Sequence, residues 1–276
     1  MELELKRCGR TARVETLGGE LVSYRDERGL EYIWGGDPAY WPGRNPLLFP
    51  IVGMLKEGKI RFDGREYAME RHGFARRREF TPAARGEDWV RLELRESAET
   101  LALYPYPFRL AVEQRLTDTG FSTAVTVANP GEGPLPCCLG AHTGFRCPLE
   151  AVERFEDYEL VFPERESCPT LLLRDGLLDR PAALPCLEDT DTLPLDYRWF
   201  DALDTLIFEG LRSRSVALRS RKSGRGVRVS FDGFPMLAFW TMPGKKAPYL
   251  CLEPWHGCAA GTAERPEFPD NAHCLV

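Results

Sequence analysis

Two histidines in this chain have neighbours that suit proton transfer. His72 lies in Arg-His-Gly-Phe-Ala-Arg and His142 lies in Gly-Ala-His-Thr-Gly-Phe, so each has a glycine nearby and then a phenylalanine. Glycine lets other groups approach the backbone closely, and histidine is the side chain best matched to proton transfer near neutral pH. Both are candidate acids or bases, although such a histidine is more often a hydrogen-bonded structural residue.

A carboxylate near the C-terminus is the third candidate. Glu253 follows an apolar run that begins at Pro248, which predicts a buried strand. Burial of a lone carboxylate is costly, so Glu253 must be paired, hydrogen-bonded or protonated. Pro254 is expected to end the strand there, and Trp255 offers an aromatic face that suits a sugar ring. The spacing is equally compatible with Glu253 as a turn cap and Trp255 as a core residue.

Other chemistries lack their motifs. The sequence has no Gly-x-Gly-x-x-Gly, no phosphate-binding loop and no Gly-x-Ser-x-Gly. Nine cysteines include no Cys-x-x-Cys, and no histidine stands at zinc-finger spacing, so no metal site is expected. The residues therefore favour chemistry that needs neither a metal nor an organic cofactor.

The composition is that of a globular protein. The chain has 276 residues, 43% hydrophobic and 28% charged, with a formal net charge of −6, which argues against disorder and against nucleic-acid binding. No apolar signal region and no run long enough to cross a bilayer are present. We therefore expect one cytoplasmic domain over residues 1–276 with reduced thiols and no membrane partner, acting as a monomer or homodimer.

The elements that must position these residues are strands. Apolar residues alternate with polar ones over 90–94, 121–127 and 227–231. Asp63-Gly64 between 59–62 and 65–69 predicts a hairpin. Helix is expected only as short turns, within 150–158 and 171–179, and 163–195 reads as an irregular surface excursion. Many short strands with polar turns predict an all-β sandwich or barrel.

Five sequence blocks, in order, resemble the aldose 1-epimerase (galactose mutarotase-like) family, in particular its bacterial branch with the His-Gly-Phe-Ala-Arg motif. The blocks are Trp-Gly-Gly-Asp-Pro-Ala-Tyr-Trp at 34–41, Pro-Leu-Leu-Phe-Pro-Ile-Val-Gly at 46–53, His-Gly-Phe-Ala-Arg at 72–76, Gly-Ala-His-Thr-Gly-Phe at 140–145 and Cys-Leu-Glu-Pro-Trp at 251–255. The resemblance implies an antiparallel β-supersandwich that binds a sugar on one concave face, with no cofactor.

The resemblance also implies catalytic roles. His142 resembles the general acid that protonates the ring oxygen, and Glu253 resembles the general base that takes the proton from the anomeric hydroxyl. The expected reaction is interconversion of the α and β anomers of an aldose by ring opening and reclosure. A raised Glu253 pKa and a His142 that stays protonated in the free enzyme would suit these roles.

Further residues resemble the family's sugar-binding groups. His72 resembles the second histidine, which holds the sugar, and Arg76 would line the site. Asp204 resembles the acid that grips sugar hydroxyls, with Asp201 as its rival.

One position departs from the family pattern. Met54 stands where the branch usually has an arginine that contacts the sugar, and methionine has no hydrogen-bond donor. Lys56 or Arg44 could substitute, or substrate preference or activity could differ.

Two other functions stay open on the sequence. Arg76, Arg77 and Arg78 could meet a phosphate, which would make the protein a hexose-6-phosphate 1-epimerase. A non-catalytic carbohydrate-binding protein on the same fold is the second alternative, although such a protein would not need an acid–base pair.

Overall fold

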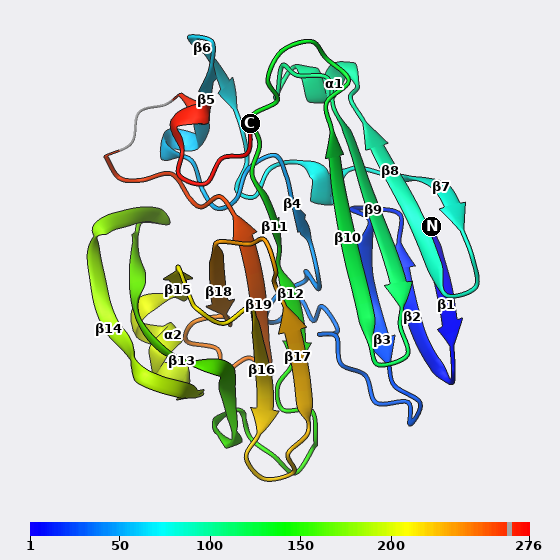
Figure 1. Cartoon of the computed structure of the whole chain (residues 1–276), viewed down its shortest axis with the longest axis vertical. Coiled ribbons are helices and arrows are strands. Elements are labelled where there is room, and N and C mark those ends of the chain that lie inside the picture. The colour runs from blue at the N-terminus through cyan, green and yellow to red at the C-terminus, as the bar shows by residue number, and fades with distance from the viewer. Residues whose placement is uncertain (264–266) are drawn as a thin grey trace.

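The structure is a computed structural model that describes residues 1–263 and 267–276, and strands dominate it (Figure 1). The strands are β1 Glu2–Arg7, β2 Arg10–Glu15, β3 Glu20–Arg25, β4 Leu47–Leu48, β5 Lys59–Phe62, β6 Arg65–Ala68, β7 Thr81–Arg85, β8 Trp89–Arg95, β9 Arg109–Leu116, β10 Phe121–Ala128, β11 Leu139–Ala141, β12 Thr143–Arg146, β13 Tyr158–Arg174, β14 Leu177–Pro194, β15 Thr205–Glu209, β16 Ser215–Ser220, β17 Gly226–Ser230, β18 Met236–Trp240 and β19 Tyr249–His256. Helix is limited to α1 Ala98–Leu101, α2 Tyr197–Leu203 and the 3₁₀ turns η1 Lys56–Gly58, η2 Ala75–Arg77, η3 Phe155–Asp157 and η4 Phe268–Asp270.

The strands form antiparallel sheets, and the three larger ones lie on two sides of the molecule. On one side, the sheet β1-β2-β3 contacts β9 of the sheet β10-β9-β8-β7 (Figure 1). On the other side, a ten-stranded sheet runs in the order β17-β16-β13-β15-β18-β19-β11-β4, with β12 on β19 and β14 on β13. The main cluster of buried side chains includes residues from Leu3 to Phe268. The expected antiparallel β-supersandwich is confirmed. None of the described helices is long and apolar enough to cross a bilayer.

β19 lies inside the large sheet and separates the core from the candidate site. Leu250 and Leu252 belong to the main core cluster, whereas Tyr249 and Cys251 belong to a second, aromatic cluster. This division follows the alternation of side chains along a strand. Because both faces are covered, the strand is apolar throughout, which is the pattern the sequence shows.

Strand register sets His142 opposite Glu253. β11 pairs Gly140 with Trp255, and β12 pairs Thr143 with Leu252. The register is the same on both sides of the break between β11 and β12, so position 142 faces position 253. Proline has no N–H to donate to a ladder, and the break spans Pro254. The prediction that the strand stops at Glu253 is wrong, because β19 continues to His256.

Several sequence predictions are confirmed. The hairpin with its turn at Asp63-Gly64 is β5–β6, and the three alternating runs are β8, β10 and β17. The short turn expected within 150–158 is η3.

Two predictions about the segment after Tyr158 are wrong. Residues 163–195 are mostly the long hairpin β13–β14, and 171–179 is the end of that hairpin rather than a helical turn. The hairpin carries register shifts between Val161 and Leu172, and these irregularities explain why no clear alternation reveals it. The helix α2 was not predicted from the sequence.

The loop that carries His72 is fixed against the segment after β4. Gly73 forms a parallel bridge with Phe49, and the N–H groups of Phe74 and Ala75 both donate to the Phe49 carbonyl. A Cβ at Gly73 would lie 2.2 Å from the Phe49 carbonyl oxygen, and the residue has a φ of +70°. Glycine is therefore required here for both space and conformation.

We expect Gly73→Ala to lower the free energy of unfolding by more than ~2 kcal/mol, because it adds a steric clash to the left-handed backbone. Chemical denaturation measures this change. The matched control is Gly64→Ala, which has a φ of +76° with nothing within 4 Å of the added Cβ and should cost about 1 kcal/mol. Equal losses in the two variants would contradict the steric account.

Candidate active site

His142 and Glu253 form a buried pair at the break in the ladder. Nε2 of His142 lies 3.3 Å from Oε1 of Glu253, and the two residues are 8% and 1% exposed. Among the described residues, Nδ1 of His142 and both carboxyl oxygens of Glu253 have no hydrogen-bond partner. A buried polar atom without a hydrogen-bond partner costs free energy. Such atoms are typical of a site where a ligand supplies the missing partner.

Burial makes both members of the pair neutral. It lowers the pKa of His142 to about 3, partly opposed by a hydrogen bond with its own backbone and assisted by the positive charges of Arg76 and Arg71. Burial raises the pKa of Glu253 well above its usual value, and the charge of Asp204 adds to this rise. The raised pKa of Glu253 agrees with what the base role would require. The lowered pKa of His142 does not agree with a histidine kept protonated in the free enzyme, because the dry site disfavours the imidazolium.

His72 meets His142 edge to face. The ring centroids are 5.5 Å apart at an interplanar angle of 89°. The Gly53 N–H donates to Nδ1 of His72 over 3.1 Å, and the His72 N–H donates back to the Gly53 carbonyl over 2.8 Å. Burial, then the nearby His142, lowers the pKa of His72 well below its usual value. A neutral ring that accepts at Nδ1 carries its proton on Nε2, so Nε2 is a donor.

Half-buried indoles surround His142. Trp41 lies with its ring centroid 4.9 Å from that of His142 at 31°, and Trp240 lies at 5.6 Å. Trp41 belongs to the 34–41 block that carries the family resemblance, but the sequence did not single it out as a residue of the site. Trp255, which was singled out instead, is 5% exposed within the core cluster. Its indole N–H is near enough to Glu253 to oppose the rise in pKa, but has no hydrogen bond among the described residues.

The two candidate aspartates lie in different surroundings. Asp204 follows α2 with a φ of +63°, and its charge acts on Glu253. Thr205 Oγ1 donates to Asp204 Oδ2 over 2.8 Å. Asp201 accepts a hydrogen bond from the Gly244 N–H over 2.7 Å. Asp204 is therefore the one whose charge acts on the His142–Glu253 pair, while Asp201 holds the turn at Gly244.

Arg76 and Arg71 supply positive charge beside the two histidines. Nη2 of Arg76 donates to the Arg71 carbonyl over 2.8 Å, while Nε of Arg76 is buried without a partner among the described residues. Burial, then the charge of Arg77, lowers the pKa of Arg76. Arg71 was missed by sequence analysis, and its position directly before His72 was the signal that could have revealed it.

The proposed substitutes for an arginine at Met54 are engaged elsewhere. Lys56 Nζ donates to the Thr262 carbonyl over 3.1 Å, and Arg44 Nε donates to the Gly35 carbonyl over 3.1 Å. The guanidinium that lies against Met54 is that of Arg71, whose Nη2 is 3.6 Å from the Met54 Sδ.

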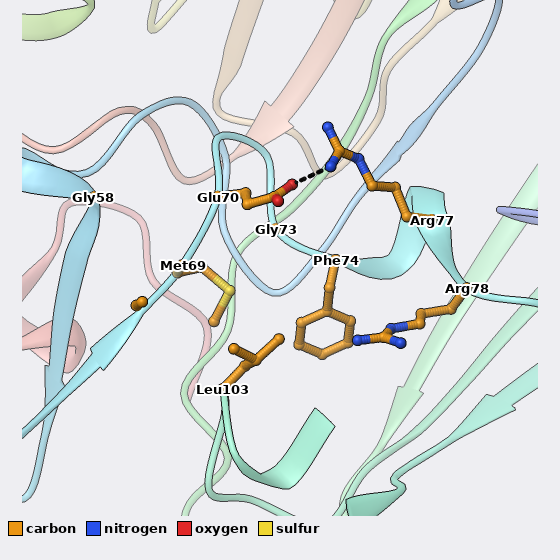
Figure 2. Close-up of a pocket in the computed structure, with 9 residues that line it drawn as sticks. Gly58, Met69, Glu70, Gly73, Phe74, Arg77, Arg78 and Leu103 are labelled. Atoms are coloured by element: carbon orange, nitrogen blue, oxygen red, sulfur yellow. Dashed lines mark ion pairs between the residues drawn. The ribbon is translucent and has the colours of Figure 1, made fainter. Parts of the chain in front are cut away.

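The remaining arginines of the 76–78 cluster face a different cleft. Arg77 pairs with Glu70 at 2.6 Å, and Arg78 pairs with Glu99. Figure 2 shows Arg77 and Arg78 around a cleft of about 640 Å³ that is lined also by Phe74. The cleft does not include His142 or Glu253 among its lining residues. The three arginines therefore do not act together on the histidines.

A second cavity, of about 700 Å³, is lined by Gly140, Ala141, Thr143 and Pro254. These residues flank His142 and Glu253 in the chain, and side chains alternate between the faces of a strand. The cavity therefore lies across the sheet from the side chains of His142 and Glu253.

The pair also belongs to a group that could hold a metal ion. Donor atoms of His142, Cys251 and Glu253 all lie within 4.8 Å of one another. A metal would need the thiolate and the carboxylate. Burial raises the pKa of Cys251 well above its usual value, as it does for Glu253. A metal ion at this position would therefore have to displace the protons of both Cys251 and Glu253.

Comparison with known proteins places the chain in one family. Residues 1–269 match the family model for aldose 1-epimerase. The plasmid-encoded protein LacX of Lactococcus lactis subsp. lactis is 42% identical over 272 residues, which cover 96% of this chain and 90% of the relative. The chromosomal LacX of the same organism is also 42% identical over 272 residues, with the same coverage.

Solved structures agree with this assignment. A galactose mutarotase related enzyme from Lactobacillus acidophilus superimposes with a TM-score of 0.95 at 26% identity, covering 100% of this chain and 92% of the other. A galactose mutarotase-like protein from Lactobacillus casei gives 0.93 at 26% identity, with 100% and 94% coverage.

We expect the imidazole of His142 to titrate with a midpoint near 3, observed by histidine-selective NMR. Unfolded chains bind this proton near pH 6.5, so they hold more protons than the folded state between pH 6.5 and 3. The free energy of unfolding should therefore fall as pH drops through this window.

His142→Asn should remove that part of the pH dependence. Denaturation of the wild type and of the variant at several pH values measures the difference in their free energies of unfolding. A His142 midpoint near 6.5 in the folded protein would contradict the account.

Proposed function

This chain belongs to the aldose 1-epimerase family and is an isomerase of that class, and from this premise we propose that His142 and Glu253 carry the proton transfers of anomer interconversion. The observation that supports the proposal is the buried pair with a 3.3 Å separation and unpartnered polar atoms. No group other than this pair is needed to move a proton between the anomeric hydroxyl and the ring oxygen.

Ring opening needs a base at one oxygen and an acid at the other. Glu253 takes the proton from O1–H, the O1 electrons form the C1=O1 bond, and the C1–O5 bond breaks. O5 takes the proton of His142. The C1–C2 bond then turns, and closure on the other carbonyl face returns both protons. Positioned acid–base groups of this kind contribute roughly 10²–10⁴-fold.

The pair must therefore hold one proton in total. In the free enzyme this proton is on Glu253, because burial disfavours both the carboxylate and the imidazolium. Transfer to His142 gives the charged arrangement that opens the ring. After opening, Glu253 carries the proton and His142 is neutral, which matches the free enzyme. The neutral pair is thus one of two arrangements that alternate during turnover.

The sugar is held by groups around the pair. We propose that His72 donates to a sugar oxygen from Nε2, and that Arg76 and Asp204 bind further oxygens. Trp41 and Trp240, both half-buried, offer the aromatic surface beside His142 on which a sugar ring could stack. Trp255, expected from the sequence to contact the sugar, instead lies where it would position the Glu253 carboxyl.

The two alternatives receive less support. A hexose-6-phosphate substrate was suggested by three consecutive arginines, two of which are ion-paired at another cleft. A non-catalytic sugar-binding protein would have no use for a desolvated acid–base pair, whose burial costs stability.

We also propose that the chain acts as one domain in the cytoplasm, as a monomer or homodimer, with a small sugar as its partner and no nucleic acid. The continuous core cluster supports one domain.

We expect Glu253→Gln to keep the fold and to lower anomer exchange by roughly 10²–10⁴-fold, because the amide cannot accept the O1 proton. Saturation-transfer NMR on a panel of free aldoses and hexose 6-phosphates, corrected for spontaneous exchange, measures the rate. Circular dichroism and thermal melting establish that the variant is folded. Wild-type rates in a folded Glu253→Gln protein would remove the base assignment.

We expect His142→Asn to lose turnover while sugar affinity changes little, because the acid acts after the sugar is bound. Rates at saturating sugar and dissociation constants from NMR titration separate the two effects. If affinity collapses while turnover at saturation persists, His142 is a binding residue and the acid is another group.

A further inference from the structure

Arg71 lies at the rim of the site, beside a residue that cannot satisfy it. Its Nη2 is 3.6 Å from the Met54 Sδ, and a thioether is only a weak acceptor. Arg71 is exposed, whereas Met54 is half-buried. A guanidinium has five N–H donors, so most of those on Arg71 remain available to a ligand.

The tip of the β13–β14 hairpin holds this guanidinium in place. A Cβ on Gly176 would lie 2.7 Å from the Met54 Cε and 2.9 Å from the Arg71 Nη2. The hairpin thus packs directly over both side chains, and Gly176 has a φ of +78° that suits glycine. Three separate segments therefore meet at this point of the rim.

The charge of Arg71 is directed toward the histidines and is not neutralised. Arg71 and Arg76 both lower the pKa of His72 and of His142, so both lie near the pair. Neither forms an ion pair with a carboxylate within 1–263 and 267–276. By contrast, Arg77 pairs with Glu70 at 2.6 Å across the other cleft (Figure 2).

We propose that Arg71 is a substrate-binding residue that determines specificity, and that Met54 is its apolar support. The guanidinium donates to sugar oxygens on the His72 side of the site. Position 71 thus supplies the guanidinium that Met54 does not. The inference rests on the proposed function, since it names a binding group of the same site. A guanidinium fork suits adjacent oxygens, such as a vicinal pair of hydroxyls.

The first test compares Arg71→Gln with Arg77→Gln. A hydrogen bond to a charged group is worth about 1.5–3 kcal/mol, so Arg71→Gln should raise KM for the preferred aldose by roughly 10- to 100-fold. The kcat should stay within about twofold, because the contact is made equally before and during the reaction. Arg77→Gln should behave as wild type. Equal KM values in the two variants would overturn the proposal.

The second test returns the guanidinium from a different backbone position. In the Met54→Arg/Arg71→Gln double variant, the new arginine starts from the residue that Arg71 now touches. We expect KM to recover most of the loss seen in Arg71→Gln. A purely structural role of Arg71 would not be restored by this exchange, so a KM equal to that of Arg71→Gln would also overturn the proposal.

The measurements keep this inference separate from the proposed function. If the wild type accelerates anomer exchange and Arg71→Gln leaves KM unchanged, the proposed function stands and the role of Arg71 fails. If the wild type accelerates no exchange, the proposed function fails, and NMR titration with the same sugars still tests Arg71. A 10- to 100-fold weaker dissociation constant in Arg71→Gln would then support the binding role, and an unchanged one would reject it.

Discussion

The candidate site depends on a cross-strand contact between two ionisable groups that are removed from water. His142 and Glu253 face each other where the ladder on β19 is interrupted, and neither finds another partner among the described residues. Charge on either is disfavoured by burial, so the pair is stable only while it holds one proton. A pair in that state can accept and donate a proton at the same time, which is what opening a sugar ring demands.

The large sheet makes this burial possible by using its two faces differently. One face of β19 adds Leu250 and Leu252 to the core, and the other presents Glu253 and also Cys251, which packs in the aromatic cluster. The core face supplies the hydrophobic free energy that holds the strand in place. The site face can then tolerate polar atoms without partners, whose cost is offset by packing elsewhere.

The rim of the site is built from segments that are distant in the chain. The loop at His72 is tied to Gly53 by reciprocal hydrogen bonds, and the hairpin tip at Gly176 covers Met54 and Arg71. These contacts place two arginines beside two histidines. Burial is the main cause that lowers the pKa of both imidazoles, and the charges of the arginines add to it. The groups proposed to bind the sugar and those proposed to transfer protons are therefore coupled by charge as well as by proximity.

Much was determined by the sequence itself. Alternation and turn residues predicted the strands and the β5–β6 hairpin, because these depend on local periodicity. The histidine and glutamate motifs identified residues that the fold brings together. Tertiary structure alone decided the β13–β14 hairpin, whose register shifts hide its period, and the proton state of His142, which depends on water excluded by residues far along the chain. It also decided that Arg71, rather than Lys56 or Arg44, lies against Met54, because side-chain proximity across loops leaves no trace in local spacing.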